Sequence, residues 1–359
     1  MQYTTLGHTG AIVSRLCLGT MTFGVEVSRT QPIGGVDRDA ADRILGRAMD
    51  NGVNFIDTAD VYGNGASETL LGQVLGARRE QIVLATKFNG RMGPGANDAG
   101  QSRLNLYRAL DASLRRLRTD HIDLYQVHNF DPITPVEETL RALDDVVRAG
   151  KVRYIGCSNY AAWQLVKALG CSERHGLNRF ATVQSFYSIA GRDVERELLP
   201  AAHSEKIGML CWSPLAGGLL SGKVDRNSAP AADTRRGRLS FPPVDEAKAL
   251  DIIDVLKAIA AKHETTVPAV ALAWLLLRTG VTSVICGISK PDHLDSFRAA
   301  IDLRLDEDDL MQLDDVSRSQ ASYPGWIQTY RASNRIPKGY PDLRSSWGPG
   351  ERPVDPWIG

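Results

Sequence analysis

The sequence predicts a single (β/α)₈ barrel, closed at one end by a short N-terminal hairpin and followed by an irregular tail. Eight short apolar segments rich in β-branched residues recur along the chain, and amphipathic helical patterns separate them. Several of these segments are almost entirely apolar, which is typical of parallel strands covered on both faces. No linker rich in Pro, Gly or Ser interrupts the series, so one domain is expected.

The expected strands and helices follow in order. The strands are residues 15–19, 53–57, 82–87, 122–128, 152–158, 181–187, 208–213 and 282–287. In residues 102–119, leucines at helical spacing form one apolar stripe. A further helix is expected to have Thr134 as its cap and Pro135 as its first helical residue. Glu137 would complete a capping box, and Gly150 would end the helix.

The two ends of the chain are expected to lie outside the eight units. Residues 3–14, "YTTLGHTGAIVS", predict two short strands around a turn that could close the bottom of a barrel. We expect residues 1–320 to form the barrel and residues 321–359 a tail that contributes to the substrate mouth. The alternative fold, an open doubly wound sheet, usually has G-x-G-x-x-G after its first strand, and "LGTMTFG" does not match.

Composition excludes several classes of protein. The 42 basic and 42 acidic residues cancel, which argues against a nucleic-acid partner. No apolar run of about 18 residues predicts a membrane span, and the first residues do not resemble a secretory signal. None of the five cysteines forms a C-x-x-C pair. We expect buried thiols in a reducing cytoplasm and no metal site; an oligomer is possible but cannot be read from the sequence.

Polar side chains end successive strands of the predicted barrel. In this architecture the carboxyl ends of the strands converge on one mouth, where chemistry is found. Tyr62 follows the second strand by five residues, inside the segment "DTADVYGNG". The strand-end residues are Asp57, Lys87, His128, Ser158 with Asn159, and Gln184. We therefore expect a polar site at this end of the barrel.

The chain resembles the aldo-keto reductases, a family of nicotinamide-dependent (β/α)₈ oxidoreductases. The similar segments run in order from residue 15 to about 300: "GTMTFG", "NFIDTADVYGNGASETLLG", "VLATK", "SLRRLRTDHIDLYQVH", "GKVRYIGCSNY", "VQSFYS", "WSPLAGGLLSGK" and "GISKPDHL". The resemblance implies that Asp57, Tyr62, Lys87 and His128 are catalytic, with Tyr62 as general acid/base. It also implies NADP(H) as cofactor and a small carbonyl or alcohol as substrate.

The residue types suit that chemistry. A tyrosine has a pKa of about 10, and a nearby cation stabilises its phenolate and lowers that pKa. Lys87 could supply the cation, and Asp57 on the adjacent strand could pair with it. His128 could hydrogen-bond the substrate oxygen and orient it.

The resemblance also implies a set of cofactor contacts. Ser158, Asn159 and Gln184 would bind the nicotinamide carboxamide, and Trp212 would stack on its ring. Ser289 and Lys290 precede a helix expected to begin at Pro291, which suits the 2′-phosphate of NADP(H). The other expected contacts are Gly19, Thr20, Met21, Ser213, Pro214, Leu215, Gly217, Lys223, Arg238, Gly287 and His293. Residues 217–223 spell G-x-x-x-x-G-K, but Val224 follows where a P-loop has Ser or Thr.

The substrate is the least defined part of this prediction. The family often has Gln and Asn at the positions of His293 and Phe297, so the adenine contact departs from the family pattern. The expected walls of the substrate pocket are Phe23, Phe88, Asn129, Phe130, Tyr323 and Trp326. An alternative function is a redox-sensing, nucleotide-binding accessory subunit with little turnover, because potassium-channel β subunits share this fold and the four catalytic residues.

Overall fold

The computed structural model describes residues 1–24, 34–226, 228, 234–289, 293–328 and 331. The strands are β1 (Tyr3–Thr5), β2 (Ile12–Ser14), β3 (Leu16–Gly19), β4 (Phe55–Asp57), β5 (Val83–Phe88), β6 (Ile122–Val127), β7 (Val152–Ser158), β8 (Phe180–Phe186), β9 (Gly208–Trp212) and β10 (Val281–Gly287). The helices are α1 (Arg38–Asp50), α2 (Ala66–Leu75), α3 (Arg103–Leu117), α4 (Val136–Arg148), α5 (Ala162–His175), α6 (Leu198–Ser204), α7 (Arg235–Arg238), α8 (Glu246–Lys262), α9 (Val267–Leu276), α10 (His293–Asp302) and α11 (Glu307–Ser317).

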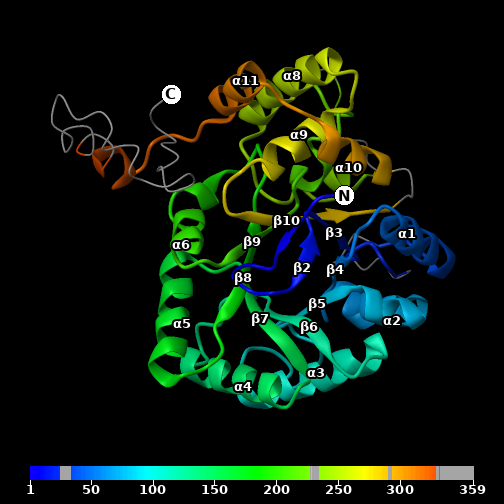
Figure 1. Cartoon of the computed structure of the whole chain (residues 1–359), viewed down its shortest axis with the longest axis vertical. Coiled ribbons are helices and arrows are strands. Elements are labelled where there is room, and N and C mark those ends of the chain that lie inside the picture. The colour runs from blue at the N-terminus through cyan, green and yellow to red at the C-terminus, as the bar shows by residue number, and fades with distance from the viewer. Residues whose placement is uncertain (25–33, 227, 229–233, 290–292, 329–330, 332–359) are drawn as a thin grey trace.

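The predicted (β/α)₈ barrel is confirmed. Within the described residues, β3 to β10 close into one parallel barrel in chain order, and the helices surround it (Figure 1). Asp57 is opposite Ala85, Lys87 is opposite Gln126, and Ser158 is opposite Gln184. The polar strand ends therefore lie at one rim, because parallel strands in this register end together.

The predicted N-terminal hairpin closes the other end. β1 and β2 pair antiparallel, and Leu6 and Val13 join a small apolar cluster with residues of the barrel strands. Gly7 has φ of 59°, and a Cβ there would lie 2.2 Å from the Ala181 carbonyl oxygen, at the beginning of β8. Only glycine permits this close approach. The barrel interior is thus sealed on the side away from the polar rim.

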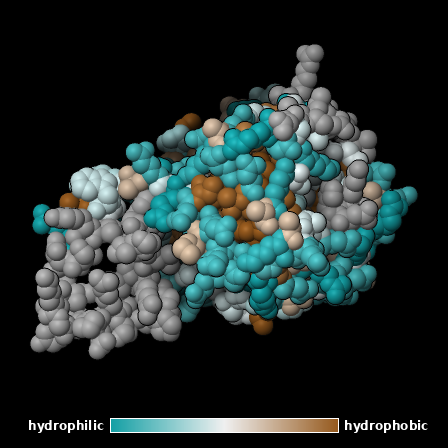
Figure 2. Space-filling model, turned by 90° about the horizontal axis from the view of Figure 1, so that it is seen from above, coloured by the Kyte–Doolittle hydropathy of each residue, from teal (hydrophilic) through white to brown (hydrophobic). Residues whose placement is uncertain are grey.

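The main core lies between the barrel strands and the helices. α9 is buried along its whole length, whereas α1 and α4 bury only one stripe. Figure 2 shows one face of the molecule that is largely hydrophilic, with an apolar area near its middle. No helix in the described ranges is both long enough and apolar enough to cross a bilayer.

Two local expectations were wrong. α4 begins at Val136 with Pro135 as its N-cap, and no side chain in the described ranges caps it. Thr134 instead donates its hydroxyl to Asp131 at 2.6 Å, because the preceding turn offers a carboxylate acceptor within reach. The cysteines on the strands are buried, but Cys171, on α5, is partly exposed.

Candidate active site

The segment that carries Tyr62 is held against the end of β5. The backbone N–H of Thr58 donates to the Ala85 carbonyl at 2.9 Å, and that of Asp60 donates to the Lys87 carbonyl at 3.1 Å. A tight turn, Tyr62–Gly65, then leads into α2. Gly65 has φ of 90°, and a Cβ there would lie 2.9 Å from the Arg116 side chain. This turn places Tyr62 over the rim beside Lys87.

Lys87 connects the four predicted catalytic residues. Its Nζ lies 2.5 Å from Asp57 Oδ1, 2.8 Å from the Thr58 carbonyl oxygen and 3.2 Å from the Tyr62 hydroxyl. The His128 ring meets the Tyr62 ring edge-on, with centroids 5.8 Å apart. The structure therefore brings the side chains of all four residues together at the rim.

Asp57 has two further hydrogen-bond partners, and one of them, Gln126, was not predicted from the sequence. Its Oδ2 accepts from Gln126 Nε2 at 3.2 Å and from Gln184 Nε2 at 3.0 Å. Both glutamines are buried inside the barrel. Gln126 shares strand parity with His128 two residues later, and this alternation could have identified it. The amide nitrogen of Gln184, which was expected to bind nicotinamide, thus points at Asp57.

Burial and charge set the protonation of these groups. Burial raises the pKa of Tyr62, and the lowering effect of Lys87 does not outweigh it. This corrects the expected direction: a cation is present, but removing the phenol from water has the larger effect. Burial opposes the charge on Lys87, yet Asp57 and Tyr62 together raise its pKa. Burial and the charge of Lys87 lower the pKa of His128 to about 3, so its imidazole is neutral.

Three expected nicotinamide-binding residues lie beside His128. Ser158 Oγ is buried and has no hydrogen-bond partner among the described residues. Asn159 donates to the His128 carbonyl at 2.9 Å, and Trp212 Nε1 donates to Asn159 Oδ1 at 3.0 Å. The Trp212 ring stacks on Phe241, 5.8 Å between centroids. A buried hydroxyl without a partner is costly, and a ligand amide would satisfy it.

The segment after β9 carries Arg235, which was not among the cofactor contacts predicted from the sequence. Gly217 has φ of 71°, and a Cβ there would lie 2.3 Å from the Phe241 carbonyl oxygen. Arg238, the expected contact, is exposed, whereas Arg235 is partly exposed and its charge slightly opposes the raised pKa of Tyr62. Arg235 Nε has no hydrogen-bond partner within the described residues. A buried guanidinium nitrogen that has no partner among the described residues suits an anionic ligand.

The other expected cofactor residues are placed as follows. Gly19, Thr20 and Pro214 are buried, while Met21, Ser213 and Leu215 are partly exposed. Thr20 Oγ1 is 3.0 Å from Ser67 Oγ. Lys223, Gly287 and Ser289 are exposed. Lys290 lies outside the described residues, and His293 is described only as the first residue of α10.

The expected substrate residues do not form one group. Asn129 is exposed at the rim and accepts from Asn159 Nδ2 at 3.1 Å. The Phe130 ring packs edge-on against Tyr160, and none of its ring contacts among the described residues is with a predicted catalytic residue. Phe88 is stacked on Tyr125 in the core outside the strands, because it alternates with the inward-facing Lys87. Phe23 is also fully buried in this core.

The tail aromatics lie apart from the rim. Tyr323 and Trp326 are 76% and 50% exposed, and their rings contact each other. They follow α11, where the chain leads away from the barrel (Figure 1). The described part of the tail therefore does not support the expected role of these two residues at the substrate mouth.

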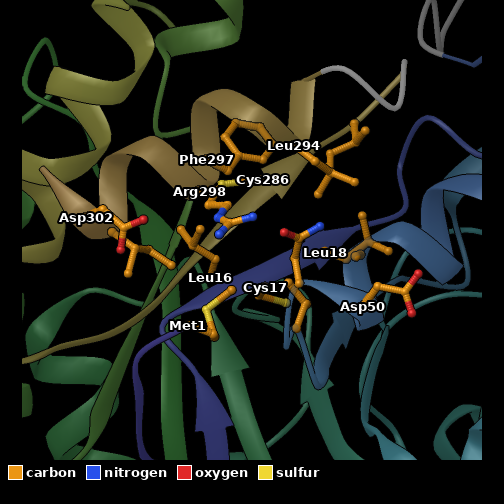
Figure 3. A pocket seen from close by; sticks show the side chains of 15 residues that line it. Met1, Leu16, Cys17, Leu18, Asp50, Cys286, Leu294, Phe297, Arg298 and Asp302 are labelled. Atoms are coloured by element: carbon orange, nitrogen blue, oxygen red, sulfur yellow. The ribbon is translucent and has the colours of Figure 1, made fainter. Parts of the chain in front are cut away.

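A cavity of about 270 Å³ lies outside the barrel, between β3, β10, α1 and α10 (Figure 3). Leu16, Leu18, Leu294 and Phe297 contribute to its wall, and none of the four predicted catalytic residues does. Phe297 is thus 7% exposed, and its side chain points into the protein toward this cavity.

Comparison with known proteins identifies the class that this barrel and rim define. The model of the Aldo/keto reductase family matches residues 15–318. The chain therefore belongs to the aldo/keto reductase family and is an oxidoreductase. Members of this family generally use NAD(P)H and act on small carbonyl compounds.

Individual relatives cover nearly the whole chain. "Uncharacterized oxidoreductase YrpG" of Bacillus subtilis is 40% identical over 88% of this chain and 96% of its own length. "Probable voltage-gated potassium channel subunit beta" of Arabidopsis thaliana is 36% identical over 84% and 92%. "Versiconal hemiacetal acetate reductase" of Aspergillus parasiticus is 30% identical over 90% and 99%.

Proposed function

We propose that this protein is an NADP(H)-dependent reductase of aldehydes and ketones, with Tyr62 as general acid/base. The observation that carries the proposal is the position of Lys87, whose Nζ contacts both Asp57 and the Tyr62 hydroxyl at the rim. A cofactor at this rim is supported by Ser158 Oγ and Arg235 Nε, which are buried and have no hydrogen-bond partner among the described residues. Ser158 and Asn159 would hold the carboxamide, and Arg235 would hold a phosphate.

The reduced nicotinamide supplies a hydride when it is bound. Tyr62 gives its hydroxyl proton to the substrate oxygen, and its raised pKa keeps that proton available at neutral pH. The charge of Lys87 stabilises the phenolate that remains, and Asp57 holds Lys87 in place. The neutral imidazole of His128 donates an N–H to the same oxygen and orients it.

The preference for NADP(H) over NAD(H) rests on Ser289 and Lys290, which are expected near the 2′-phosphate. A charge-assisted contact of this kind is worth about 1.5–3 kcal/mol. Lys290→Glu should therefore weaken NADPH binding strongly and NADH binding little. Equal weakening of both dissociation constants, or a wild type that prefers NADH, would overturn the preference.

A second function is favoured by the 36% identity to a protein named as a potassium-channel subunit. In that role the chain would bind the nucleotide and turn over very little. Purified protein should be mixed with excess NADPH and a panel of aldehydes and ketones. Sustained oxidation of NADPH over many turnovers supports the reductase. Oxidation limited to one bound equivalent supports the accessory role.

A further inference from the structure

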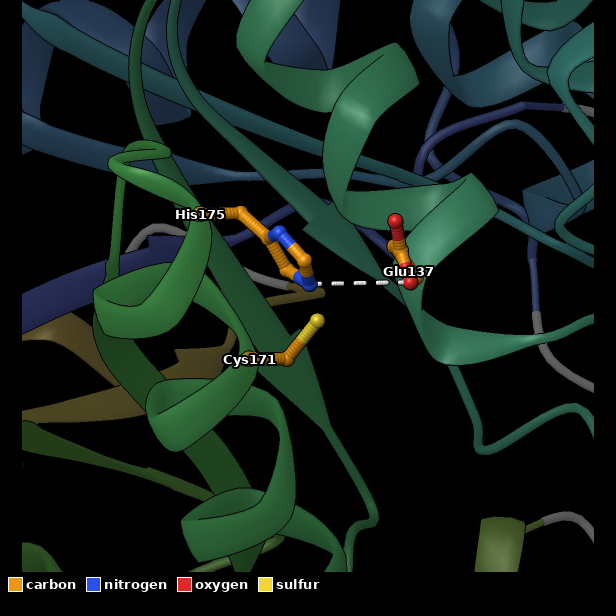
Figure 4. A group of neighbouring side chains, drawn as sticks. All are labelled: Glu137, Cys171 and His175. Carbon is orange, nitrogen blue, oxygen red and sulfur yellow. Dashed lines mark ion pairs between the residues drawn. The ribbon is translucent and has the colours of Figure 1, made fainter.

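Three side chains with metal-binding atoms meet in the outer helical layer, away from the polar rim. Glu137 is the second residue of α4, and Cys171 and His175 lie four residues apart on α5, on one face of that helix. Figure 4 shows the three side chains directed into the space between the two helices. One carboxylate oxygen, Sγ and one ring nitrogen all lie within 4.8 Å of one another.

The spacing is close to that of a coordinated ion. Bond lengths of about 2.0–2.3 Å in a tetrahedral zinc site place neighbouring ligand atoms about 3.5 Å apart. His175 Nε2 is already 3.6 Å from Glu137 Oε2. Cys171 Sγ lies within 4.8 Å of both of these atoms, so binding of an ion would require it to move closer by about 1 Å. Three protein ligands would leave a fourth position for water.

The kinds of donor select the kind of metal. Thiolate and imidazole are poor ligands for Mg²⁺ or Ca²⁺ and good ligands for Zn²⁺. A thiolate and a carboxylate together neutralise the two positive charges of the ion. Burial and the charge of Glu137 raise the pKa of the Cys171 thiol, although Arg174, Arg141 and Lys167 lower it. The metal must therefore displace the thiol proton, and its binding weakens as pH falls.

Arg141 competes for the same carboxylate. Its Nε donates to Glu137 Oε1 at 2.9 Å, and its Nη2 is 3.4 Å from His175 Nδ1. Both Arg141 and Glu137 are about half exposed, so this ion pair is weak and rearranges readily. The oxygen that faces His175 is Oε2, which leaves Oε1 for the arginine when the ion is bound.

We propose that Glu137, Cys171 and His175 bind one divalent cation of the Zn²⁺ type between α4 and α5. The sequence predicts no metal site, because none of its cysteines forms a C-x-x-C pair, and Glu137 is far from Cys171 and His175 in the chain. The ion would link the two helices across the outer layer, in addition to the reaction at the rim.

Cobalt provides a direct test in the full-length protein after treatment with a chelator. Titration with Co²⁺ should reach one equivalent, with a sulfur-to-cobalt absorption band in the near ultraviolet that Zn²⁺ abolishes by competition. Cys171→Ser should remove the band. Glu137→Gln and His175→Ala should each weaken Zn²⁺ binding at least about tenfold. Changing a residue that only supports a metal ligand already lowers metal affinity by about that much, and these two residues would be ligands themselves.

Two further variants make the test specific. Arg141→Ala should tighten binding, because it removes the competing cation. His203→Ala, at an exposed histidine on α6, should leave the titration unchanged. The proposal is overturned if no thiolate band forms, or if Cys171→Ser and His203→Ala give the same Zn²⁺ affinity as the wild type.

Discussion

Lys87 donates a hydrogen bond of 2.5 Å to Asp57 on the neighbouring strand, and the two side chains are only 0% and 2% exposed. A buried ion pair of this kind is weak support for stability, because both charges lose their hydration. The same Lys87 Nζ also contacts the Tyr62 hydroxyl. We infer that the pair is maintained for the site, and this can be separated from stability by experiment.

Replacing only one member of the Lys87–Asp57 pair should destabilise the protein more than replacing both. Lys87→Met leaves Asp57 charged and enclosed and should lower the free energy of unfolding by about 3–5 kcal/mol. The double variant Lys87→Met/Asp57→Asn removes both charges and keeps an oxygen that can accept from the amides of Gln126 and Gln184, so it should recover much of this stability and remain inactive. Urea unfolding and turnover of the same samples would be compared. A double variant less stable than Lys87→Met would contradict the interpretation.

Tyr62→Phe should remove catalysis while leaving nucleotide binding nearly intact. Only the proton donor is lost, and a general acid contributes roughly 10²–10⁴-fold to the rate. Turnover of an aldehyde and the dissociation constant of NADPH would be measured together. If the variant retained more than about a tenth of the wild-type kcat, Tyr62 would not be the acid.

Arg235 and Arg238 offer a matched comparison within one short helix. Arg235 is partly exposed, with a buried Nε that has no hydrogen-bond partner in the described part of the chain, and Arg238 is exposed. Arg235→Met should weaken NADPH binding by roughly ten- to a hundredfold, the range for a lost charge-assisted hydrogen bond. Arg238→Met should change it little. If the two substitutions changed the NADPH dissociation constant equally, Arg235 would have no special role in binding the cofactor.

Asp60 should make stability depend on pH. It is 1% exposed, and burial together with the charge of Glu68 raises its pKa to about 8, whereas an aspartate in an unfolded chain titrates near 3.9. Between about pH 4 and pH 8 only the folded protein holds this proton. The free energy of unfolding therefore falls as pH rises through that window, by at most about 1.4 kcal/mol per pH unit.

Asp60→Asn should remove this dependence. The variant should be close to the wild type in stability near pH 4 and more stable near pH 8, because over that range only the wild type must hold a proton, or a buried charge, in order to stay folded. Urea unfolding at the two pH values would measure the difference. A wild type that is equally destabilised relative to the variant at both values would exclude Asp60 as the titrating group.

The strands and their polar ends could be predicted because both are local properties of the sequence. An apolar run such as residues 152–158 must be covered on both faces wherever it lies, and it became β7 without change. Asp57, Lys87 and His128 ended their segments, and closure of a parallel barrel brings such ends to one rim. The fold, and the meeting of the four predicted catalytic residues at one rim, could therefore be predicted from the sequence.

Tertiary structure alone decided how those groups interact. Strand parity turned Phe88 away from the rim and Gln126 toward Asp57. Burial by neighbouring elements raised the pKa of Tyr62 in spite of Lys87. The same packing left Arg238 exposed but covered part of Arg235, although the two residues lie in one short segment. Glu137 came to face Cys171 and His175 only because α4 and α5 pack together. Burial and electrostatic interaction depend on distances in space, and these distances arise only when residues far apart in the chain are packed against one another.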